Sequence, residues 1–368
     1  MSILFESSEI NGMKLRNRFV RSATWEGMAT PEGAVTPKLV ETMTLLGKGG
    51  VGLIISSHAY IRPEGQATPW QIGVYEDRLV EGLRSMTTAV HDAGGKICLQ
   101  LAHAGNFAAE ALTGTPPLVV SDYEGLAKTP RKELTIEDIG DLVGAYAAAA
   151  GRAKAAGFDG VQIHSAHGYL LSQFLSPAFN RRADGYGGSI QNRSRIHREI
   201  LHAIRGVTGR NYPVVIKLNC RDFTEDGLSL EDAIIAAGLL AAAGLDAIEL
   251  SGGLLFSRKL SPSRPRIDSE DKEAYFREEL RAFKKQIHIP LILVGGIRSF
   301  GVAEGLVTEG SADYISMCRP FICEPDLIAR WQSGDRRPAE CRSDNLCFGP
   351  GREGGGIWCM TKQRGEIA

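Results

Sequence analysis

Two stretches of the chain decide the fold: VGLII at positions 51–55 and PLILV at positions 290–294. Both are apolar at nearly every position, whereas a strand with one solvated face alternates apolar and polar residues. A near-continuous apolar run is typical of a parallel strand that is buried on both faces. Similar short runs occur along the whole chain. The sequence therefore predicts eight buried strands, at 19–23, 51–57, 96–101, 160–164, 213–218, 247–250, 291–294 and 314–317.

Stretches with helical spacing of apolar residues separate these strands. They lie at about 37–48, 77–93, 135–156, 192–208, 229–243, 273–286 and 299–309. Thr135 and Ser229 each have an aspartate three residues later, which is a signature of a helix N-terminus. Four glycines lie where helices should end and can adopt the left-handed conformation of a C-cap: Gly94, Gly157, Gly244 and Gly310.

Eight strand–helix units can close into a barrel or form an open doubly wound sheet. The barrel is favoured because strands occur throughout the chain, no linker divides it, and the unusual polar residues follow the strands. We therefore predict an α/β protein with a single (β/α)8 TIM barrel over residues 1–335. A β-hairpin before the first strand, long loops at 102–134 and 251–272, and a cysteine-containing tail at 336–368, packed on the barrel, account for the extra length.

The composition argues against several classes of protein. With 42 Lys and Arg against 43 Asp and Glu, the formal net charge is −1, so nothing indicates a nucleic-acid or anionic-membrane partner. No apolar run is long enough to cross a bilayer, and the N-terminus lacks the pattern of a signal peptide. The seven cysteines do not form an even disulfide framework. We therefore expect a cytoplasmic globular protein.

Chemistry-bearing side chains are densest in IHSAHGYLL at positions 163–171, where the strand 160–164 ends. His164, His167 and Tyr169 should project over the barrel mouth. Neutral imidazoles and a phenol can donate hydrogen bonds to an oxygen that gains negative charge in a reaction. One alternative is a pair of capping histidines, and another is a zinc site, although no carboxylate follows at a metal-ligand spacing. The pattern favours a clamp for a substrate anion, with no metal.

Two further polar residues lie on predicted strands. Gln100 ends one strand, where its amide could pair with the edge of a heterocycle. Lys217 lies inside the apolar run VVIKLN, and a buried lysine is rare unless it has a partner. The partner is either an anionic ligand, which we favour, or Glu249 on the next strand, in an internal ion pair.

A phosphate cradle is predicted after the last two strands. Strand 291–294 runs into Gly295 and Gly296, and strand 314–317 into Cys318 and Arg319. Phosphate sites in barrels recur at this position, where glycines expose backbone N–H groups and an arginine can grip two phosphate oxygens. Together these residues predict a phosphorylated heterocycle that lies across the barrel mouth, with a substrate stacked on it.

Several motifs resemble the Old Yellow Enzyme family of FMN-dependent NAD(P)H oxidoreductases. They are RSAT at 21–24, QLAHAG at 100–105, VGGI at 294–297, CRPFICEPDL at 318–327 and IHSAHGYLLSQFLSPAFNRRADGYGGSIQNRSR at 163–195. The resemblance extends in register from residue 1 to about 335. It implies a non-covalent FMN that is reduced by NADH or NADPH and then passes hydride to an activated alkene.

The resemblance also implies roles for individual residues. The substrate-binding pair falls on His164 and His167, and the proton-donating tyrosine on Tyr169. The flavin ring would be contacted by Gln100 and Lys217, although many relatives have arginine at the second position. The remaining cofactor positions fall on Ala23, Thr24, Ser57, Gly295, Gly296, Cys318 and Arg319.

This resemblance implies reduction of the C=C bond of an α,β-unsaturated carbonyl compound: an enone, an enoate or an enoyl thioester. His164 and His167 would bind the carbonyl oxygen, and Tyr169 would protonate the α-carbon. The natural alkene, the choice between NADH and NADPH, and homo-oligomerisation are left open by the sequence.

The tail departs from the family pattern. Longer relatives hold an iron–sulfur cluster on four cysteines, but Asp344 stands here between Cys341 and Cys347, with Cys359 downstream. We do not expect a cluster held by four cysteines; three thiolates and a carboxylate could bind zinc, and free cysteines are the interpretation that we prefer. Because the chain ends at residue 368, we expect a short form in which electrons reach FMN directly.

Two rival functions are compatible with a barrel. One is an aldolase or isomerase that holds a sugar phosphate and uses Lys217 as a Schiff-base lysine. The other is a non-catalytic flavin- or metal-binding module, which would need neither the imidazole pair nor the phenol beside it.

Overall fold

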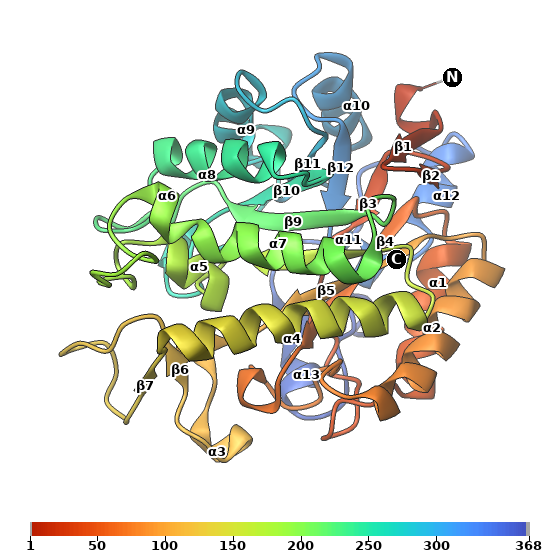
Figure 1. The fold of residues 1–368 in the computed structure, drawn as a ribbon. Coiled ribbons are helices and arrows are strands. Elements are labelled where there is room, and N and C mark those ends of the chain that lie inside the picture. The colour runs from red at the N-terminus through yellow and green to blue at the C-terminus, as the bar shows by residue number, and fades with distance from the viewer. Residues whose placement is uncertain (1, 366–368) are drawn as a thin grey trace.

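A computed structural model describes residues 2–365. Eight parallel strands close into a barrel in the order β10-β11-β12-β3-β4-β5-β8-β9, and helices surround it (Figure 1). The strands are β3 (Phe19–Arg21), β4 (Leu53–Tyr60), β5 (Ile97–Ala102), β8 (Gly160–Ser165), β9 (Val214–Asn219), β10 (Ala247–Ser251), β11 (Leu291–Val294) and β12 (Tyr314–Met317). All eight predicted strands are present, so the predicted TIM barrel is confirmed.

Inward-facing residues form two layers inside the barrel. Ile55, Cys98, Val215 and Ile292 belong to one buried apolar cluster, which also contains residues of the hairpin β1 (Ser8–Ile10) and β2 (Met13–Leu15). The hairpin therefore covers the end at which the barrel strands begin. Successive side chains of a strand alternate between its faces, so the next inward position lies two residues further along. On several strands this position is polar, as at Gln100, Lys217 and Glu249. The polar layer lies toward the carboxyl ends of the strands.

Most of the predicted helices and helix caps are present in the structure. The longer helices are α1 (Pro37–Lys48), α2 (Val80–Asp92), α4 (Ile136–Ala155), α7 (Arg195–Thr208), α8 (Leu230–Ala242), α9 (Arg277–Lys284) and α10 (Phe300–Thr308). The Thr135 side chain and Asp138 form a reciprocal capping box, and Ser229 caps α8. The four predicted C-cap glycines all have positive φ, between 72° and 94°.

The helix predicted at 273–286 begins four residues late, at Arg277. Glu273 is extended instead, and its carboxylate accepts hydrogen bonds from the backbone N–H groups of Arg298 and Ser299. The backbone N–H of Tyr275 donates to the Gly295 carbonyl. This segment therefore holds the loop after β11 in place, and these tertiary contacts override its helical spacing.

Short elements fill the loops and the tail. They are η1 (Ile3–Phe5), η2 (Pro63–Gly65), η3 (Asp77–Leu79), η4 (Gly105–Phe107), α3 (Glu110–Thr113), β6 (Leu118–Val119), β7 (Lys132–Glu133), α5 (Leu170–Leu175), α6 (Ile190–Arg193), η5 (Arg258–Leu260), η6 (Glu270–Lys272), α11 (Arg319–Cys323), α12 (Leu327–Gln332), η7 (Leu346–Phe348), α13 (Gly349–Arg352) and α14 (Met360–Gln363). The tail contacts the barrel: the Ile357 N–H donates to the Glu26 carbonyl over 2.8 Å, and Lys38 Nζ donates to the Gly355 carbonyl. Among the described residues, none of the helices combines the length and apolar character of a membrane span.

The long helix α7 is fixed to strand β8 by a buried polar contact. His197 Nε2 lies 2.8 Å from Ser165 Oγ, and the His197 side chain is fully buried. Burial lowers the pKa of His197 to about 3, and it lowers the pKa of His103, next to the barrel mouth, to about 3 as well. Both imidazoles are therefore neutral in the folded protein at ordinary pH.

We predict that acidification destabilises the fold from about pH 6.5 downward. In the unfolded chain these imidazoles take up protons near pH 6.5, whereas in the folded chain they stay neutral to about pH 3. The unfolded state then binds more protons, so the free energy of unfolding falls by about 1.4 kcal/mol per pH unit for each such histidine. Urea unfolding followed by circular dichroism at pH 7, 6 and 5 measures this slope.

His197→Gln should reduce that slope, whatever its effect on stability at pH 7. His202 also lies on α7 but is exposed, so His202→Gln is the matched control and should leave the slope unchanged. An unaltered slope in His197→Gln would contradict the prediction.

Candidate active site

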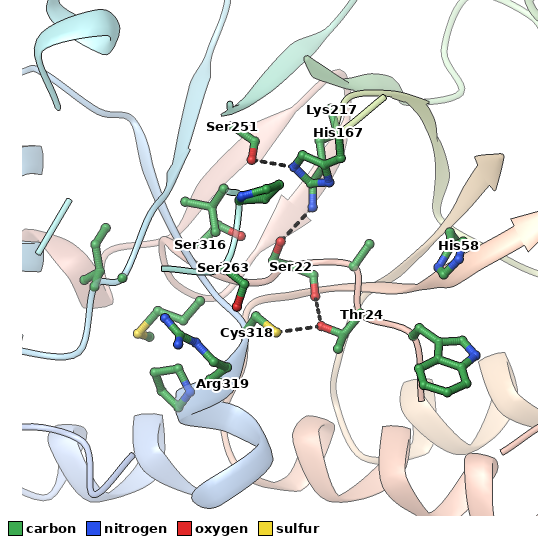
Figure 2. A pocket seen from close by; sticks show the side chains of 18 of the residues that line it. Ser22, Thr24, His58, His167, Lys217, Ser251, Ser263, Ser316, Cys318 and Arg319 are labelled. Carbon is green, nitrogen blue, oxygen red and sulfur yellow. Dashed lines mark hydrogen bonds between the residues drawn. The ribbon is translucent and has the colours of Figure 1, made fainter. Parts of the chain in front are cut away.

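One cavity lies at the carboxyl ends of the barrel strands (Figure 2). Its volume is about 1070 Å³, measured to its open mouth. Ten of the predicted site residues line it: Ala23, Thr24, Gln100, His164, His167, Tyr169, Lys217, Gly296, Cys318 and Arg319. Residues from six barrel strands or the loops after them are thus brought together, as expected for a TIM-barrel site.

Two predicted cofactor residues, Ser57 and Gly295, are not part of the cavity wall. Ser57 is buried and hydrogen-bonds to the carboxyl group of Glu26, which also forms a buried ion pair with Arg21. The Gly295 carbonyl accepts the hydrogen bond from Tyr275 described above, while the next residue, Gly296, faces the cavity with a φ of +73°. Their roles toward a cofactor remain predictions.

The floor of the cavity is a buried polar network around Lys217 and Glu249. Lys217 Nζ donates to Ser22 Oγ over 2.8 Å and lies 3.3 Å from Glu249 Oε2. The internal ion pair with Glu249 is therefore present. It is the alternative that the sequence analysis does not favour, since the favoured partner of Lys217 is an anionic ligand. The ammonium group nevertheless lines the cavity, so it can also face a ligand.

Glu249 stays ionised although it is fully buried. Burial alone would raise the pKa of Glu249, but the Lys217 ammonium group and hydrogen bonds from Ser22, Ser316 and Gln162 outweigh this effect and lower it. Gln162 in turn accepts a hydrogen bond from Gln100 Nε2 over 2.7 Å. Gln100 is thereby held in one orientation at the edge of the floor.

The wall opposite Gly296 and Arg319 carries His164, His167 and Tyr169. The ring centroids lie 5.5 Å apart for the two histidines and 4.7 Å apart for His164 and Tyr169. His167 has a positive φ of 65°, and its Nε2 lies 2.7 Å from Ser251 Oγ (Figure 2). The buried Nδ1 of His164 has no hydrogen-bond partner among the described residues. Buried polar atoms without a partner are uncommon in folded proteins, and a catalytic role is one of the explanations for them.

Burial pushes these three groups toward their neutral forms. It lowers the pKa of His164 and of His167 well below the usual value, and the neighbouring histidines and Lys217 lower them further. Burial raises the pKa of Tyr169 to about 12. Near pH 7 the site therefore offers two neutral imidazoles and a protonated phenol, which are the forms that donate hydrogen bonds or a proton.

His58 is a third cavity histidine, which the sequence analysis missed. The strand β4 runs to Tyr60 rather than ending at Ser57, and its register shifts between Ile55 and His58. The shift turns His58 into the cavity, where its Nε2 lies 3.4 Å from Tyr169 Oη. The only signal in the sequence was a histidine just beyond an apolar run, which is weak by itself.

The far end of the cavity is cationic. The Arg319 side chain is only 7% exposed, and its Nη1 donates to Asn345 Oδ1 over 2.8 Å. Within residues 2–365 no carboxylate forms an ion pair with this guanidinium group, which lines the cavity and can therefore face an anion. Asn345, together with the cavity-lining Ser343 and Phe348, comes from the tail, whose part in the site the sequence analysis missed.

The tail cysteines are free thiols. Cys341 and Cys347 are buried, and Cys359 is half-buried. Asp344 accepts hydrogen bonds from Thr361 Oγ1 and from the Leu346 N–H. Across the described part of the chain, no group of three His, Cys, Asp or Glu side chains is arranged to hold a metal ion.

Comparison with known proteins agrees with the fold. The sequence model of the NADH:flavin oxidoreductase / NADH oxidase family matches residues 3–337. The chain is 34% identical over 353 residues to an NADH oxidase of Thermoanaerobacter brockii, covering 94% of this chain and 53% of that protein. It is 30% identical to a 4,4'-dithiodibutanoate disulfide reductase of Rhodococcus erythropolis, covering 94% and 92%. The chain spans about half the length of the NADH oxidase and of a similar metal reductase.

Solved structures extend the comparison. An Old Yellow Enzyme homologue from Zymomonas mobilis superposes with a TM-score of 0.77 at 28% identity, covering 92% of this chain and 94% of that one. A 2-naphthoyl-CoA reductase superposes with a TM-score of 0.89 at 27% identity, covering 97% of this chain and 56% of that one. The resemblance to Old Yellow Enzymes is thus confirmed, and this chain belongs to the NADH:flavin oxidoreductase / NADH oxidase family.

Proposed function

We propose that this chain is an FMN-dependent oxidoreductase that uses NADH or NADPH to reduce the activated C=C bond of α,β-unsaturated carbonyl compounds. The observation that carries the proposal is the wall of two neutral imidazoles and one protonated phenol above the Lys217 floor. Family membership supports flavin-dependent oxidoreduction, but its members also include a metal reductase and a disulfide reductase, so the acceptor has to be argued from the residues.

The cavity suits FMN. It lies at the carboxyl ends of the barrel strands, where TIM-barrel enzymes bind their ligands, and it is lined by cationic and polar side chains that can hold a phosphate and a heterocycle. Arg319, which has no carboxylate partner among residues 2–365, would hold the phosphate together with the backbone of Gly296. Lys217 and Gln100 would face the ring, and Ala23 and Thr24 would line it. When bound there, FMN supplies hydride transfer between a nicotinamide and an electron-poor carbon.

His164 and His167 act on the carbonyl oxygen of the alkene substrate. A neutral imidazole N–H directed at that oxygen stabilises the negative charge that develops on it. Both histidines line the cavity, and their ring centroids lie 5.5 Å apart, so two such groups lie side by side. Binding the oxygen in this way draws electron density from the alkene, so its β-carbon becomes the position at which hydride adds.

Tyr169 supplies the proton. Its pKa of about 12 keeps the phenol protonated at working pH, and its ring lies 4.7 Å from that of His164. A substrate whose carbonyl is bound by the histidines would then present its α-carbon to the phenol. Transfer of the Tyr169 proton to this carbon completes the saturated product.

The rival use of Lys217 as a Schiff-base nucleophile fits less well. A nucleophilic lysine must be an uncharged amine, whereas Lys217 is ion-paired with Glu249 and donates a hydrogen bond to Ser22. An ammonium group held in this way can stabilise negative charge on a ligand, but it cannot attack a carbonyl.

A panel of enones, enoates and enoyl thioesters tests the proposed function directly. We expect the flavin-loaded protein to oxidise NADH or NADPH under anaerobic conditions only when an activated alkene is present, with one alkene reduced per nicotinamide. The two nicotinamides in parallel reveal which donor is used. Nicotinamide consumption with quinone, metal or disulfide acceptors but with no alkene would disprove the ene-reductase proposal.

We predict that Tyr169→Phe lowers the rate of alkene reduction by about 10²–10⁴-fold, the usual worth of a positioned general acid. Because the phenol hydroxyl is assigned only to the substrate, the FMN content and the rate of flavin reduction by nicotinamide should stay unchanged. Stopped-flow measurement of the two half-reactions separates these effects. A variant that had lost its flavin would show instead that Tyr169 has a structural role.

We predict that His164→Ala abolishes binding of simple phenols, whose phenolate oxygen resembles the charged oxygen of the reacting substrate. Binding to the oxidised flavoprotein should give a long-wavelength charge-transfer band in the wild type and none in the variant. His202→Ala, on the exposed face of α7, is the control and should retain the band. Survival of the band in His164→Ala would refute the assigned role of His164.

A further inference from the structure

A second cavity lies behind Tyr169. Its volume is about 660 Å³, and it is lined by Trp25, His58, Thr68, Pro69, Trp70, Tyr169, Phe348 and Arg352. Four of these residues also line the main cavity: Trp25, His58, Tyr169 and Phe348. These four side chains therefore form a partition between the two cavities, and His58 and Tyr169 are its polar members.

His58 is fixed within this partition. Its backbone carbonyl accepts a hydrogen bond from Gln71 Nε2 over 2.9 Å, and its ring meets the Tyr169 ring edge-on with centroids 5.5 Å apart. His58 Nε2 lies 3.4 Å from Tyr169 Oη, which is the one hydrogen-bond contact of this hydroxyl within residues 2–365. The His58 side chain is 8% exposed, so it retains a small accessible surface.

Tyr169 needs a proton source if it acts as proposed. Once it has protonated the substrate carbon, it is left as a phenolate whose conjugate acid has a pKa of about 12, in surroundings that disfavour the charge. With cofactor and product in the main cavity, the second cavity is the other space that borders Tyr169. Burial, together with the charge of Lys217, lowers the pKa of His58 to about 4, so this imidazole is neutral near pH 7 and can donate at one nitrogen while accepting at the other.

We propose that His58 is a proton relay that reprotonates Tyr169 from water in the second cavity. This inference rests on the proposed function. In each turnover the Tyr169 O–H proton forms the new C–H bond, the His58 Nε2–H proton passes to the phenolate, and water delivers a proton to Nδ1. After the product leaves, Nδ1 returns a proton to water in the second cavity, and water that enters the emptied main cavity protonates Nε2, which restores the starting tautomer. The net uptake is one solvent proton per alkene, and the relay carries no electrons.

His58 variants test the relay in the flavin-loaded, full-length protein. His58→Asn keeps a polar side chain without a relay, and His58→Ala leaves space for added imidazole. We expect each to lower kcat for alkene reduction by about tenfold or more, with KM for the alkene changed by less than about twofold. Ferricyanide takes electrons without a proton from Tyr169, so its reduction should keep most of its rate. Imidazole should restore alkene turnover in His58→Ala only.

Three comparisons separate a relay from a structural role. Thr68→Ala changes the same second cavity without touching a proton-carrying group and should match the wild type. The phenol charge-transfer band should persist in His58→Ala, which shows that the His164 and His167 wall is intact. In Tyr169→Phe the further change His58→Asn should have no added effect on alkene reduction, because residues that act as one unit are not additive.

Wild-type kcat for the alkene in His58→Asn would overturn the relay and leave the proposed function standing. Equal losses of alkene and ferricyanide turnover without imidazole rescue would overturn it in favour of a structural role. If the wild-type protein reduces ferricyanide but none of the alkenes, the proposed function fails first, and the relay fails with it.

Discussion

The fully buried carboxylate of Glu249 is the constraint on which the interior of the barrel depends. A charge at that depth is tolerated only when it is paired and hydrogen-bonded, and here Lys217, Gln162 and Ser316 meet the requirement. Each comes from a different strand, so this network links β8, β9, β10 and β12. It also separates the apolar layer below from the ligand cavity above, and thereby sets the depth at which a planar ligand can lie.

Above this charged floor, the same low-polarity surroundings act on different groups in opposite directions. Burial lowers the pKa of the histidines and raises that of Tyr169, and both shifts favour the neutral forms. The result is an ion-paired floor, from which the Lys217 ammonium group lines the cavity, under a neutral, hydrogen-bond-donating wall. This division suits a reaction in which an electron-rich ring lies on the floor while charge develops transiently on a substrate oxygen held at the wall.

The tail is part of the site as well as a cover for the barrel. Asn345 binds the Arg319 guanidinium group, Phe348 contributes to the partition between the two cavities, and Ile357 is hydrogen-bonded to Glu26. Glu26 in turn pairs with Arg21 at the end of β3. The tail therefore connects the Arg319 end of the cavity with the first barrel strand, so changes in its sequence can alter the cavity without touching a barrel strand.

The sequence by itself determined the eight strands and most of the helices and their caps. It also identified twelve candidate site residues, of which ten line the cavity. These depend on local properties: apolar runs, capping residues, and polar groups at strand ends, which a closed parallel barrel gathers at one mouth. Only the tertiary structure decided the register shift before His58, the position of Ser57 behind the wall, the pairing of Lys217 with Glu249 and the entry of the tail into the site. Each of these results from contacts between distant segments, whose balance of packing and hydrogen bonding has no local signature in the chain.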